Sequence, residues 1–306
     1  MGGGTSVLER LADGKISSSV ELVSINTDAR ALRGLEKLGI KAVQVGENVT
    51  HGYGTGGDRD KGEFAAKQDE EVLRSVLQNT DMLFITAGLG GGAGSGIAPV
   101  VASFAKEQDI LSVAIVTVPF CFEGNKRKCV AEEAIMKLEQ EVDALIVIQN
   151  DNLMELPEAK QMTIANAFDL TDEVLGNAVT LITQIITTTG DVNLDFADIK
   201  TILRQSNSSD AVFAVGESEK GDLSEAMERA CNSPLLKRSI HGAQGALLYI
   251  IGGTDMSMYD IGTAVFAMQE KMAGNESIIW GYMEGNNEEA VTVLLIATDF
   301  INEEIF

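Results

Sequence analysis

The chain has 306 residues, a formal net charge of −23 and an isoelectric point near 4.4. The length suffices for two domains with separate cores, and an apolar share of 45% is typical of a globular protein rather than a disordered one. The negative charge argues against nucleic acid or an anionic membrane as the main partner, because both require a basic face. A small anionic ligand remains compatible, since a ring of backbone N–H groups can bind phosphate inside an acidic protein.

The first half of the chain alternates between apolar runs and amphipathic stretches. The apolar runs, rich in Val and Ile, lie at 20–26, 82–88, 111–118 and 143–150. Short runs of this kind are typical of strands buried on both faces of a parallel sheet. Helical patterns fall between them at 61–78, 97–108 and 126–141. The alternation predicts a doubly wound α/β domain, in which ligands bind beyond the carboxyl ends of the strands.

The second half begins with a long helical pattern over 163–188 and continues with more strands than helices. The expected strands cover 211–218, 245–253, 277–284 and 290–300, and the expected helices cover 219–232 and 257–271. Several strands with few helices predict a mixed sheet. We therefore predict a parallel-sheet domain over 1–162, a central connecting helix over 163–189, and a smaller α+β domain with a mixed sheet over 190–306.

The three cysteines, Cys121, Cys129 and Cys231, form no pair with the spacing of metal ligands. A sparse, odd count fits a reducing compartment, so we interpret them as small apolar residues. The chain opens without a signal-peptide pattern, and no apolar run approaches the ~20 residues that span a bilayer. We expect a cytoplasmic protein that does not insert into a membrane.

The stretch GLGGGAGSG at 88–96 has six glycines in nine residues, directly after an apolar run. Glycine permits positive φ and lets backbone N–H groups approach a ligand, and a following helix adds the positive end of its dipole. This favours a phosphate-binding loop, with close packing in a tight turn as the plainer alternative. A Walker loop is excluded because the stretch lacks lysine. A dinucleotide loop requires an acid after the next strand, where Thr117-Val118-Pro119 stands, so a nicotinamide-dependent oxidoreductase is a minor alternative.

The motif GGGAGSG at 90–96 resembles the GGGTG(T/S)G signature of the tubulin/FtsZ superfamily of GTPases. Other segments resemble FtsZ segments in the family's order: NTDARAL at 26–32, VPFCFEGNKR at 118–127, VIQNDNLMEL at 147–156, NLDFADIKTIL at 193–203, SPLLKRSIHGAQGALLYIIGGT at 233–254 and AVTVLLIATDF at 290–300. The resemblance covers nearly the whole chain and is closer to FtsZ than to tubulin. It implies the tubulin/FtsZ fold, binding of GTP and GDP with Mg²⁺ held through the phosphates, and head-to-tail assembly of the chain with itself.

The resemblance also implies which residues hold the nucleotide. Gly56 and Gly57 would form the loop that closes over the γ-phosphate, and Gly2, Gly3 and Gly4 would keep part of a further nucleotide-binding turn. The phosphates would be cradled by Gly90, Gly91, Gly92, Gly94, Ser95 and Gly96. Glu123 and Arg127 would lie on the ribose side, with Asn150 at a strand end. Phe168 would stack on guanine, and Asp172 would accept hydrogen bonds from guanine N1–H and N2–H. Without the resemblance, Phe168 is more typical of a core and Glu123–Arg127 of a solvated i,i+4 pair.

The segment NLDFAD at 193–198 places two carboxylates at i and i+3 on one side of a helix start. On its own this pattern is typical of helix capping. By resemblance it is the FtsZ synergy loop, which enters the nucleotide pocket of the neighbouring subunit. Asp195 and Asp198 would orient or polarise the attacking water, and Asn193 would support the contact. Head-to-tail contacts that do not close generate a filament.

Four departures from the family pattern carry expectations of their own. Ala93 replaces the usual Thr, which removes one hydroxyl donor to phosphate and weakens nucleotide binding. The strand that precedes the first glycine turn is absent before Gly2, which leaves two strands without partners at ~1–3 kcal/mol per unsatisfied group. Thr5 stands where the family has an Asn that contacts guanine. The tail that recruits division-ring membrane tethers is absent after Phe306.

The leading interpretation is a GTP-hydrolysing cytoskeletal protein that assembles into protofilaments and forms the bacterial cell-division ring. The alternative within the same family is a diverged GTP-binding filament protein for DNA or organelle partitioning, with weak turnover. The two aspartates favour the first interpretation, whereas the absent strand and tail favour a changed role.

Overall fold

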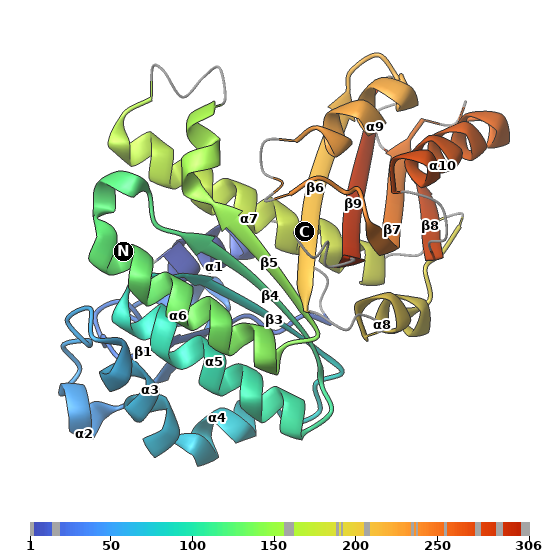
Figure 1. Cartoon of the computed structure of the whole chain (residues 1–306). Coiled ribbons are helices and arrows are strands. Elements are labelled where there is room, and N and C mark those ends of the chain that lie inside the picture. The colour runs from blue at the N-terminus through green and yellow to red at the C-terminus, as the bar shows by residue number, and fades with distance from the viewer. Residues whose placement is uncertain are drawn as a thin grey trace, which may run out of the picture. The chain divides into compact units, whose positions relative to one another are not determined.

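The computed structural model (Figure 1) describes residues 3–13, 19–155, 162–187, 190, 192–204, 209–233, 236, 238–253, 256–272, 277–285 and 290–300. The chain divides into two compact units, Met1–Thr180 and Leu181–Phe306, and each has its own hydrophobic core. The boundary falls within helix α7, Ile164–Thr187. The domain limits expected at 162 and 189 remain a prediction.

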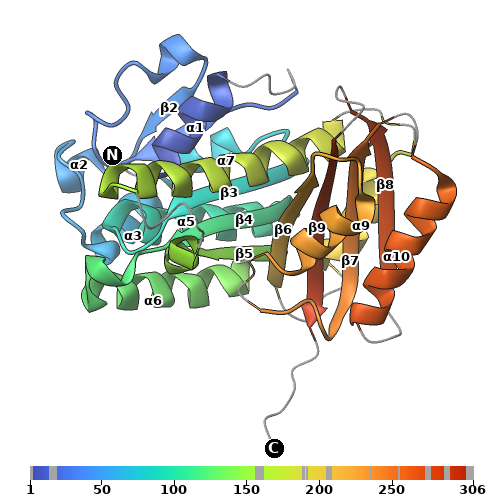
Figure 2. The same ribbon diagram turned by 90° about the horizontal axis from the view of Figure 1, so that it is seen from above.

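Unit 1 is built on parallel strands. β3 (Met82–Gly88), β4 (Leu111–Val118) and β5 (Ala144–Gln149) pair in that order and run side by side in Figure 2. α5 (Gly92–Glu107) packs against β3 and β4, and α6 (Asn125–Glu141) packs against β4 and β5. β4 is buried along its whole length, as its unbroken apolar sequence predicts. The doubly wound arrangement expected from the alternating pattern is confirmed here.

A second, two-stranded parallel sheet lies in unit 1, formed by β1 (Val23–Asn26) and β2 (Lys41–Gln44). In the described residues no ladder joins β1 to β3, although the side chains of Val23 and Ile25 pack on the same core as Ile85. Helix α1 (Gly3–Asp13) lies against β1 and β3. Among the described residues, β1 and β3 therefore belong to different sheets. The sequence did not predict α1 or the short strand β2.

The remaining helices of unit 1 differ from expectation mainly at their ends. The helix expected over 61–78 is two helices, α3 (Arg59–Gln68) and α4 (Glu70–Val76). They are separated by Asp69, whose Oδ2 accepts a hydrogen bond from the N–H of Gly46 at 2.5 Å. α5 begins five residues before the expected start at 97, so most of the glycine stretch is helical. Two short elements, α2 (Glu47–Thr50) and the 3-10 turn Leu35–Leu38, complete the unit.

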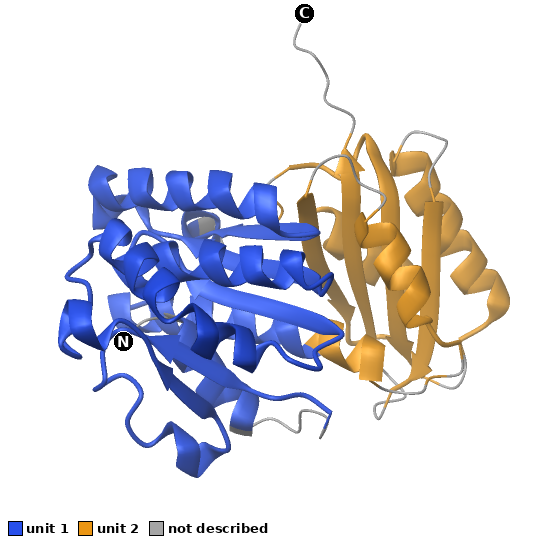
Figure 3. Ribbon diagram, turned by 90° about the horizontal axis from the view of Figure 1, so that it is seen from below, with its two compact units in different colours: residues 1–180 blue, residues 181–306 orange. Residues whose placement is uncertain are grey.

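Unit 2, orange in Figure 3, has the predicted mixed sheet. Its strand order is β6 (Asp210–Ser218), β9 (Val291–Phe300), β7 (Ala243–Gly252) and β8 (Ser277–Glu284). β9 runs antiparallel to β6 and β7, whereas β7 and β8 are parallel. The helices are α8 (Phe196–Arg204), α9 (Leu223–Cys231) and α10 (Met258–Met272). Within the described part of the chain, no helix is both long and apolar enough to cross a membrane.

Candidate functional site

The carboxyl ends of β3, β4 and β5 form one edge of the unit 1 sheet. The strands are parallel, and Gly88 pairs with Thr117 while Val118 pairs with Gln149. The segments that follow them therefore start at the same edge. These segments are the glycine stretch, the 3-10 turn Cys121–Glu123 and the 3-10 turn Asn150–Glu155. The structure brings together at this edge three regions that the sequence analysis assigned to one site.

The main glycine loop has a conformation that requires glycine at Gly90. Its φ is 88°, and a Cβ there would lie 2.4 Å from Cγ of Pro119 and 2.9 Å from the carbonyl oxygen of Arg127. The N–H of Gly90 donates to the hydroxyl of Ser95 at 2.8 Å. Because Ser95 is buried and accepts this bond, its hydroxyl braces the loop from inside. This contact gives Ser95 a role that the expected phosphate contact did not include.

The start of α5 leaves backbone donors without a helical partner. Gly91 is the N-cap and supplies no side chain, and the N–H of Ser95 is bonded to the Gly91 carbonyl at 3.2 Å. The N–H groups of residues 92–94, in the first turn of α5, have no acceptor within the helix. Together with the helix dipole they form a site for an anion. No described atom lies within 4 Å of the Cβ position of Gly91, so the approach to these donors is open there.

The other glycines of the stretch are closely packed. A Cβ at Gly92 would lie 2.0 Å from Oγ1 of Thr55, and one at Gly94 would lie 2.5 Å from the Gly88 carbonyl oxygen. A Cβ at Gly96 would lie 2.4 Å from the backbone oxygen of Arg59 on α3. Close packing, the plainer alternative, therefore accounts for these three glycines, whereas Gly91 faces open space.

The second glycine loop, at 55–58, rests on the first. Thr55 is buried and lies over Gly92, and Asp58 caps α3 by accepting from the N–H of Lys61 at 3.2 Å. Between them Gly56 and Gly57 have φ values of 65° and 83°, and no described atom lies within 4 Å of either Cβ position. Gly56 and Gly57 are therefore exposed beside the start of α5.

The first glycine cluster is placed differently from the expectation. Gly2 lies outside the described residues, and Gly3 and Gly4 open helix α1 instead of forming a turn. A Cβ at Gly4 would lie 3.0 Å from the carbonyl oxygen of Thr86, so α1 begins in close contact with β3. The helical start has a physical reason, because the apolar residues of α1 are buried against β1 and β3.

Glu123 and Arg127 form an i,i+4 ion pair at 2.5 Å, which is the plainer alternative considered for them. Glu123 does more than pair, because its Oε1 also accepts from the N–H of Phe120 at 3.0 Å and so closes the 3-10 turn. The N–H of Cys121 donates to Asp151 at 2.9 Å, which ties this turn to the end of β5. The pair lies at the sheet edge, with Glu123 nearly covered and Arg127 exposed.

Asn150 stands at the end of β5 with only 4% of its surface exposed. Its Oδ1 is buried and has no hydrogen-bond partner in the described structure. A buried acceptor of this kind normally has a donor, because leaving it unpaired costs free energy. An orphaned acceptor at this edge is what a bound ligand with a donor group would satisfy.

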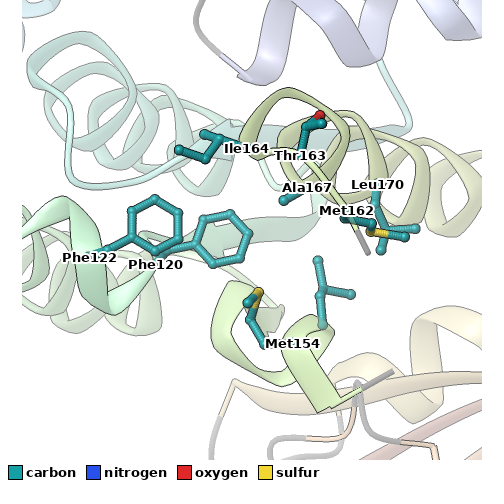
Figure 4. Close-up of a pocket in the computed structure, with 9 residues that line it drawn as sticks. Phe120, Phe122, Met154, Met162, Thr163, Ile164, Ala167 and Leu170 are labelled. Atoms are coloured by element: carbon teal, nitrogen blue, oxygen red, sulfur yellow. The ribbon is translucent and has the colours of Figure 1, made fainter. Parts of the chain in front are cut away.

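Phe168, on the first turns of α7, keeps 39% of its surface exposed. Its ring meets Phe120 edge to face, with centroids 5.4 Å apart and planes at 89°, and Phe120 stacks on Phe122 at 4.9 Å. A small cavity of about 70 Å³ opens beside the rings of Phe120 and Phe122 (Figure 4). Its lining is apolar and includes Ile164 and Met154, so it suits no phosphate. Phe168 is thus held by an aromatic contact while part of its ring stays free.

Asp172 lies one turn after Phe168 on α7 and is half-buried. Burial raises the pKa of the Asp172 carboxyl, and a hydrogen bond from Ser6 and the charge of Arg10 oppose that rise. Ser6 and Arg10 both lie on α1, so this helix forms one wall beside the carboxylate. Thr5, which replaces the family's Asn, is nearly buried on the same helix.

Asn193, Asp195 and Asp198 lie in unit 2 and are exposed. The backbone oxygen of Asp195 accepts from the N–H groups of Asp198 and Ile199 at 3.0 and 3.2 Å, so Asp195 caps α8. Oδ1 of Asn193 accepts from the N–H of Gly190 at 2.6 Å. Each unit therefore carries one part of the expected residues: unit 2 the acidic segment and unit 1 the sheet edge.

The sequence analysis missed several residues at the sheet edge, namely Thr55, Asp58, Phe120, Ser6 and Arg10. Phe120 could have been found from its place two residues before Phe122 and three before Glu123 in the same expected loop. Ser6 and Arg10 gave no signal, because α1 was not expected. No group of three or more His, Cys, Asp or Glu side chains able to hold a metal occurs among the described residues.

Comparisons with known proteins agree with this layout. Residues 2–158 match the model of the Tubulin/FtsZ family, GTPase domain, and residues 209–301 match that of the FtsZ family, C-terminal domain. An empty FtsZ dimer structure from M. jannaschii is 39% identical, with a TM-score of 0.88 over 97% of this chain and 85% of that one. Two Haloferax volcanii structures share the fold. A GTPγS-bound CetZ2 protofilament is 20% identical with a TM-score of 0.80, covering 99% and 91%. A GDP-bound CetZ1 monomer is 21% identical with a TM-score of 0.81, covering 99% and 93%.

Proposed function

This chain belongs to the tubulin/FtsZ family of GTPases, and we propose that it binds GTP along the carboxyl edge of β3, β4 and β5. We further propose that a neighbouring copy completes the hydrolytic site, so that the protein assembles head to tail into protofilaments that serve in bacterial cell division. The observation that carries the proposal is the uncapped start of α5, which faces an open approach at Gly91 beside the exposed loop of Gly56 and Gly57.

The phosphates occupy the start of α5 in this proposal. The N–H groups at 92–94 donate to phosphate oxygens, and the helix dipole adds positive potential. Gly91 leaves room for the phosphate, and the loop of Gly56 and Gly57 covers it. Ala93 contributes a backbone donor without a hydroxyl. Mg²⁺, held by the phosphate oxygens, would neutralise their charge, and the described residues offer no carboxylate cluster to replace those oxygens.

The base lies against α7. The exposed part of the Phe168 ring offers a stacking surface, and Asp172, four residues on, offers a carboxylate. A carboxylate accepts the N1–H and N2–H donors of guanine, whereas adenine lacks that pair of donors and would leave the half-buried oxygens unpaired. Asn150 supplies the orphaned acceptor at the strand end. Selection of GTP over ATP follows in this proposal from the Asp172 carboxylate, which has no matching pair of donors on adenine.

Hydrolysis needs a group that orients water at the terminal phosphate, and the described sheet edge carries mostly backbone donors there. Asp195 and Asp198 are exposed carboxylates at the start of α8, held in place by backbone bonds. We assign them to the phosphate site of the next copy, where they orient the attacking water. Such a reaction depends on positioning and charge stabilisation rather than on covalent chemistry.

Self-association is supported by the descriptions of two similar structures. The M. jannaschii FtsZ is described as a dimer and CetZ2 as a protofilament, which agrees with assembly of this chain.

The test is phosphate release from GTP with Mg²⁺ across a range of protein concentrations, with ATP as the control nucleotide. We expect release to require GTP, to rise more than linearly with protein concentration, and to be lost in Asp198→Ala while that variant still binds GTP. Turnover that stays proportional to protein concentration, or that survives in Asp198→Ala, would show that one copy holds the whole site.

A further inference from the structure

The segment before α8 alternates between outward and inward side chains. Asn193 and Asp195 are exposed, whereas Leu194 between them is only 8% exposed. In an extended segment successive side chains point to opposite sides, so the inward Leu194 fixes the outward direction of its two neighbours. The position of the first aspartate therefore depends on what Leu194 rests on.

Backbone bonds fasten this segment to the sheet of unit 2. Val192 and Tyr282 of β8 exchange two N–H···O bonds, both of 3.1 Å. A Cβ at Gly190 would lie 2.7 Å from the backbone oxygen of Tyr282 and 3.1 Å from the hydroxyl of Tyr249. The chain thus passes directly over β7 and β8 immediately before it reaches Leu194.

Leu194 rests on a seat formed by two residues of neighbouring strands. Tyr249 on β7 and Gly281 on β8 are register partners, and Tyr249 is 1% exposed. A Cβ at Gly281 would lie 2.7 Å from Cε2 of Tyr249 and 3.0 Å from Cγ of Leu194. The tyrosine ring therefore fills the space above the glycine, and Leu194 closes it. No side chain larger than hydrogen fits at Gly281 without moving the ring or the leucine.

We propose that Gly281 and Tyr249 form a seat that positions the catalytic aspartates through Leu194. This inference rests on the proposed function, in which Asp195 and Asp198 act on a neighbouring copy's phosphate. None of the three residues touches the reacting atoms, so they are positioning residues. The far side of α8 is fastened independently, because Ile202 is buried and its carbonyl accepts from the hydroxyl of Thr298 at 3.3 Å. A shift at Leu194 therefore tilts the start of α8 instead of carrying the whole helix along.

The main test variant is Gly281→Ala, whose methyl group would press on the Tyr249 ring and on Leu194. A matched control is Gly262→Ala on α10 of the same unit, where no described atom lies within 4 Å of the Cβ position. A misplacement of about 1 Å in a reacting group costs on the order of a hundredfold in rate. We expect GTP turnover of Gly281→Ala to fall about ten- to a hundredfold. Its GTP affinity at low protein concentration should match that of the parent and of Gly262→Ala.

A mixing experiment separates positioning from loss of structure. The Gly281→Ala variant has a displaced acidic segment but an intact nucleotide-binding edge. The Asp172→Asn variant binds the base weakly but has an intact acidic segment. In a mixture of the two inactive variants, the intact edge of one copy meets the intact acidic segment of the other, so turnover should return. The reference mixture pairs Asp198→Ala with Asp172→Asn and should recover to the same extent.

The outcomes distinguish failure of the shared active site from failure of the seat formed by Gly281 and Tyr249. If the reference mixture does not recover, the shared site itself is wrong. If it recovers but Gly281→Ala alone turns over like Gly262→Ala, or does not recover in its own mixture, the seat is refuted. Leu194→Ala provides a second route that adds no clash: it should lose turnover with unchanged GTP affinity, and Leu194→Met should restore most of it. Normal turnover in Leu194→Ala would equally overturn the inference.

Discussion

The two glycine loops beside the start of α5 require glycine for different physical reasons. At Gly92, Gly94 and Gly96 a Cβ would collide with neighbouring atoms at 2.0–2.5 Å, so these glycines permit close packing. At Gly56 and Gly57 no described atom is near, but φ is positive, so these glycines permit a backbone conformation. The loop at 88–96 is closely packed against its neighbours, whereas Gly56 and Gly57 are exposed. The same residue type therefore serves packing in one loop and conformational freedom in the other.

The largest effect is expected at Gly96, where a Cβ would meet backbone atoms of α3. Gly96→Ala would place a methyl group 2.4 Å from the backbone oxygen of Arg59 and 2.6 Å from the backbone nitrogen of Glu63. Neither atom can move without shifting α3 as a whole, so overpacking should destabilise unit 1 by about 3 kcal/mol. Chemical denaturation followed by circular dichroism measures the loss. A change below about 1 kcal/mol would show that α3 and α5 are packed more loosely than the structure indicates.

A smaller effect is expected in the exposed loop. Gly57→Ala meets no neighbour but must hold φ near 83°, which costs an L-residue about 1–2 kcal/mol. Asparagine tolerates this conformation better, so Gly57→Asn should recover part of the loss. Denaturation curves of the two variants give the comparison. Equal stability of both variants with the parent would mean that the loop adopts another conformation without glycine.

The sequence predicted every named strand except β2, most accurately where the strand is a nearly unbroken apolar run. β3 and β4 begin and end at the expected residues. It failed where tertiary contacts decide the local structure. α5 starts inside a glycine stretch that local propensity disfavours, because the helix packs closely on α3. α1 is helical despite its glycines, and β2 is four residues long, too short for a periodic signal.

The sequence predicted which segments of the candidate site lie together but not the roles of their members. The polar or glycine-rich segments after the runs at 82–88, 111–118 and 143–150 lie at one sheet edge, as the strand pattern predicts, whereas the run at 20–26 contains β1, which lies in a separate two-stranded sheet. It could not show that Ser95 points inward to Gly90, since a hydroxyl in a glycine loop has the same sequence signature in either orientation. Nor could it reveal Phe120 as the partner of Phe168, because the two are 48 residues apart along the chain and meet only in the fold.

Helix α3, which packs on the glycine stretch and α5, is also stabilised by ion pairs. The stability that these pairs add depends on pH. Glu63 of α3 accepts from Lys137 of α6 and from Lys67, and these bonds lower the pKa of its carboxyl from 4.5 to about 2. The folded protein binds the proton less readily than the unfolded chain. The stabilisation is therefore present above pH 4.5 and is lost as pH falls from there toward 2.

The variant Glu63→Gln should be less stable than the parent at neutral pH by up to about 1 kcal/mol, because the pair is partly exposed. The difference should shrink as the pH is lowered from 5 to 2.5, since the parent loses the same contribution by protonation. Urea denaturation at several pH values measures it. Glu71→Gln, at an exposed position on α4, is the control. A difference that stays constant with pH would mean that the carboxylate charge is not what holds α3.

The smallest effect on stability, and the most informative for function, is expected at Gly91. Its φ of −97° suits any residue and no described atom lies near its Cβ position, so Gly91→Ala should change the free energy of unfolding by less than about 0.5 kcal/mol. In the proposed site the added methyl group would occupy the space that a phosphate needs to reach the donors at the start of α5. GTP affinity, measured by fluorescence of a labelled nucleotide, should therefore fall at least tenfold in a protein that is otherwise intact. Gly96→Ala would lose affinity only together with stability. Unchanged affinity in Gly91→Ala would separate the open approach at α5 from the nucleotide and leave the glycine stretch with a packing role alone.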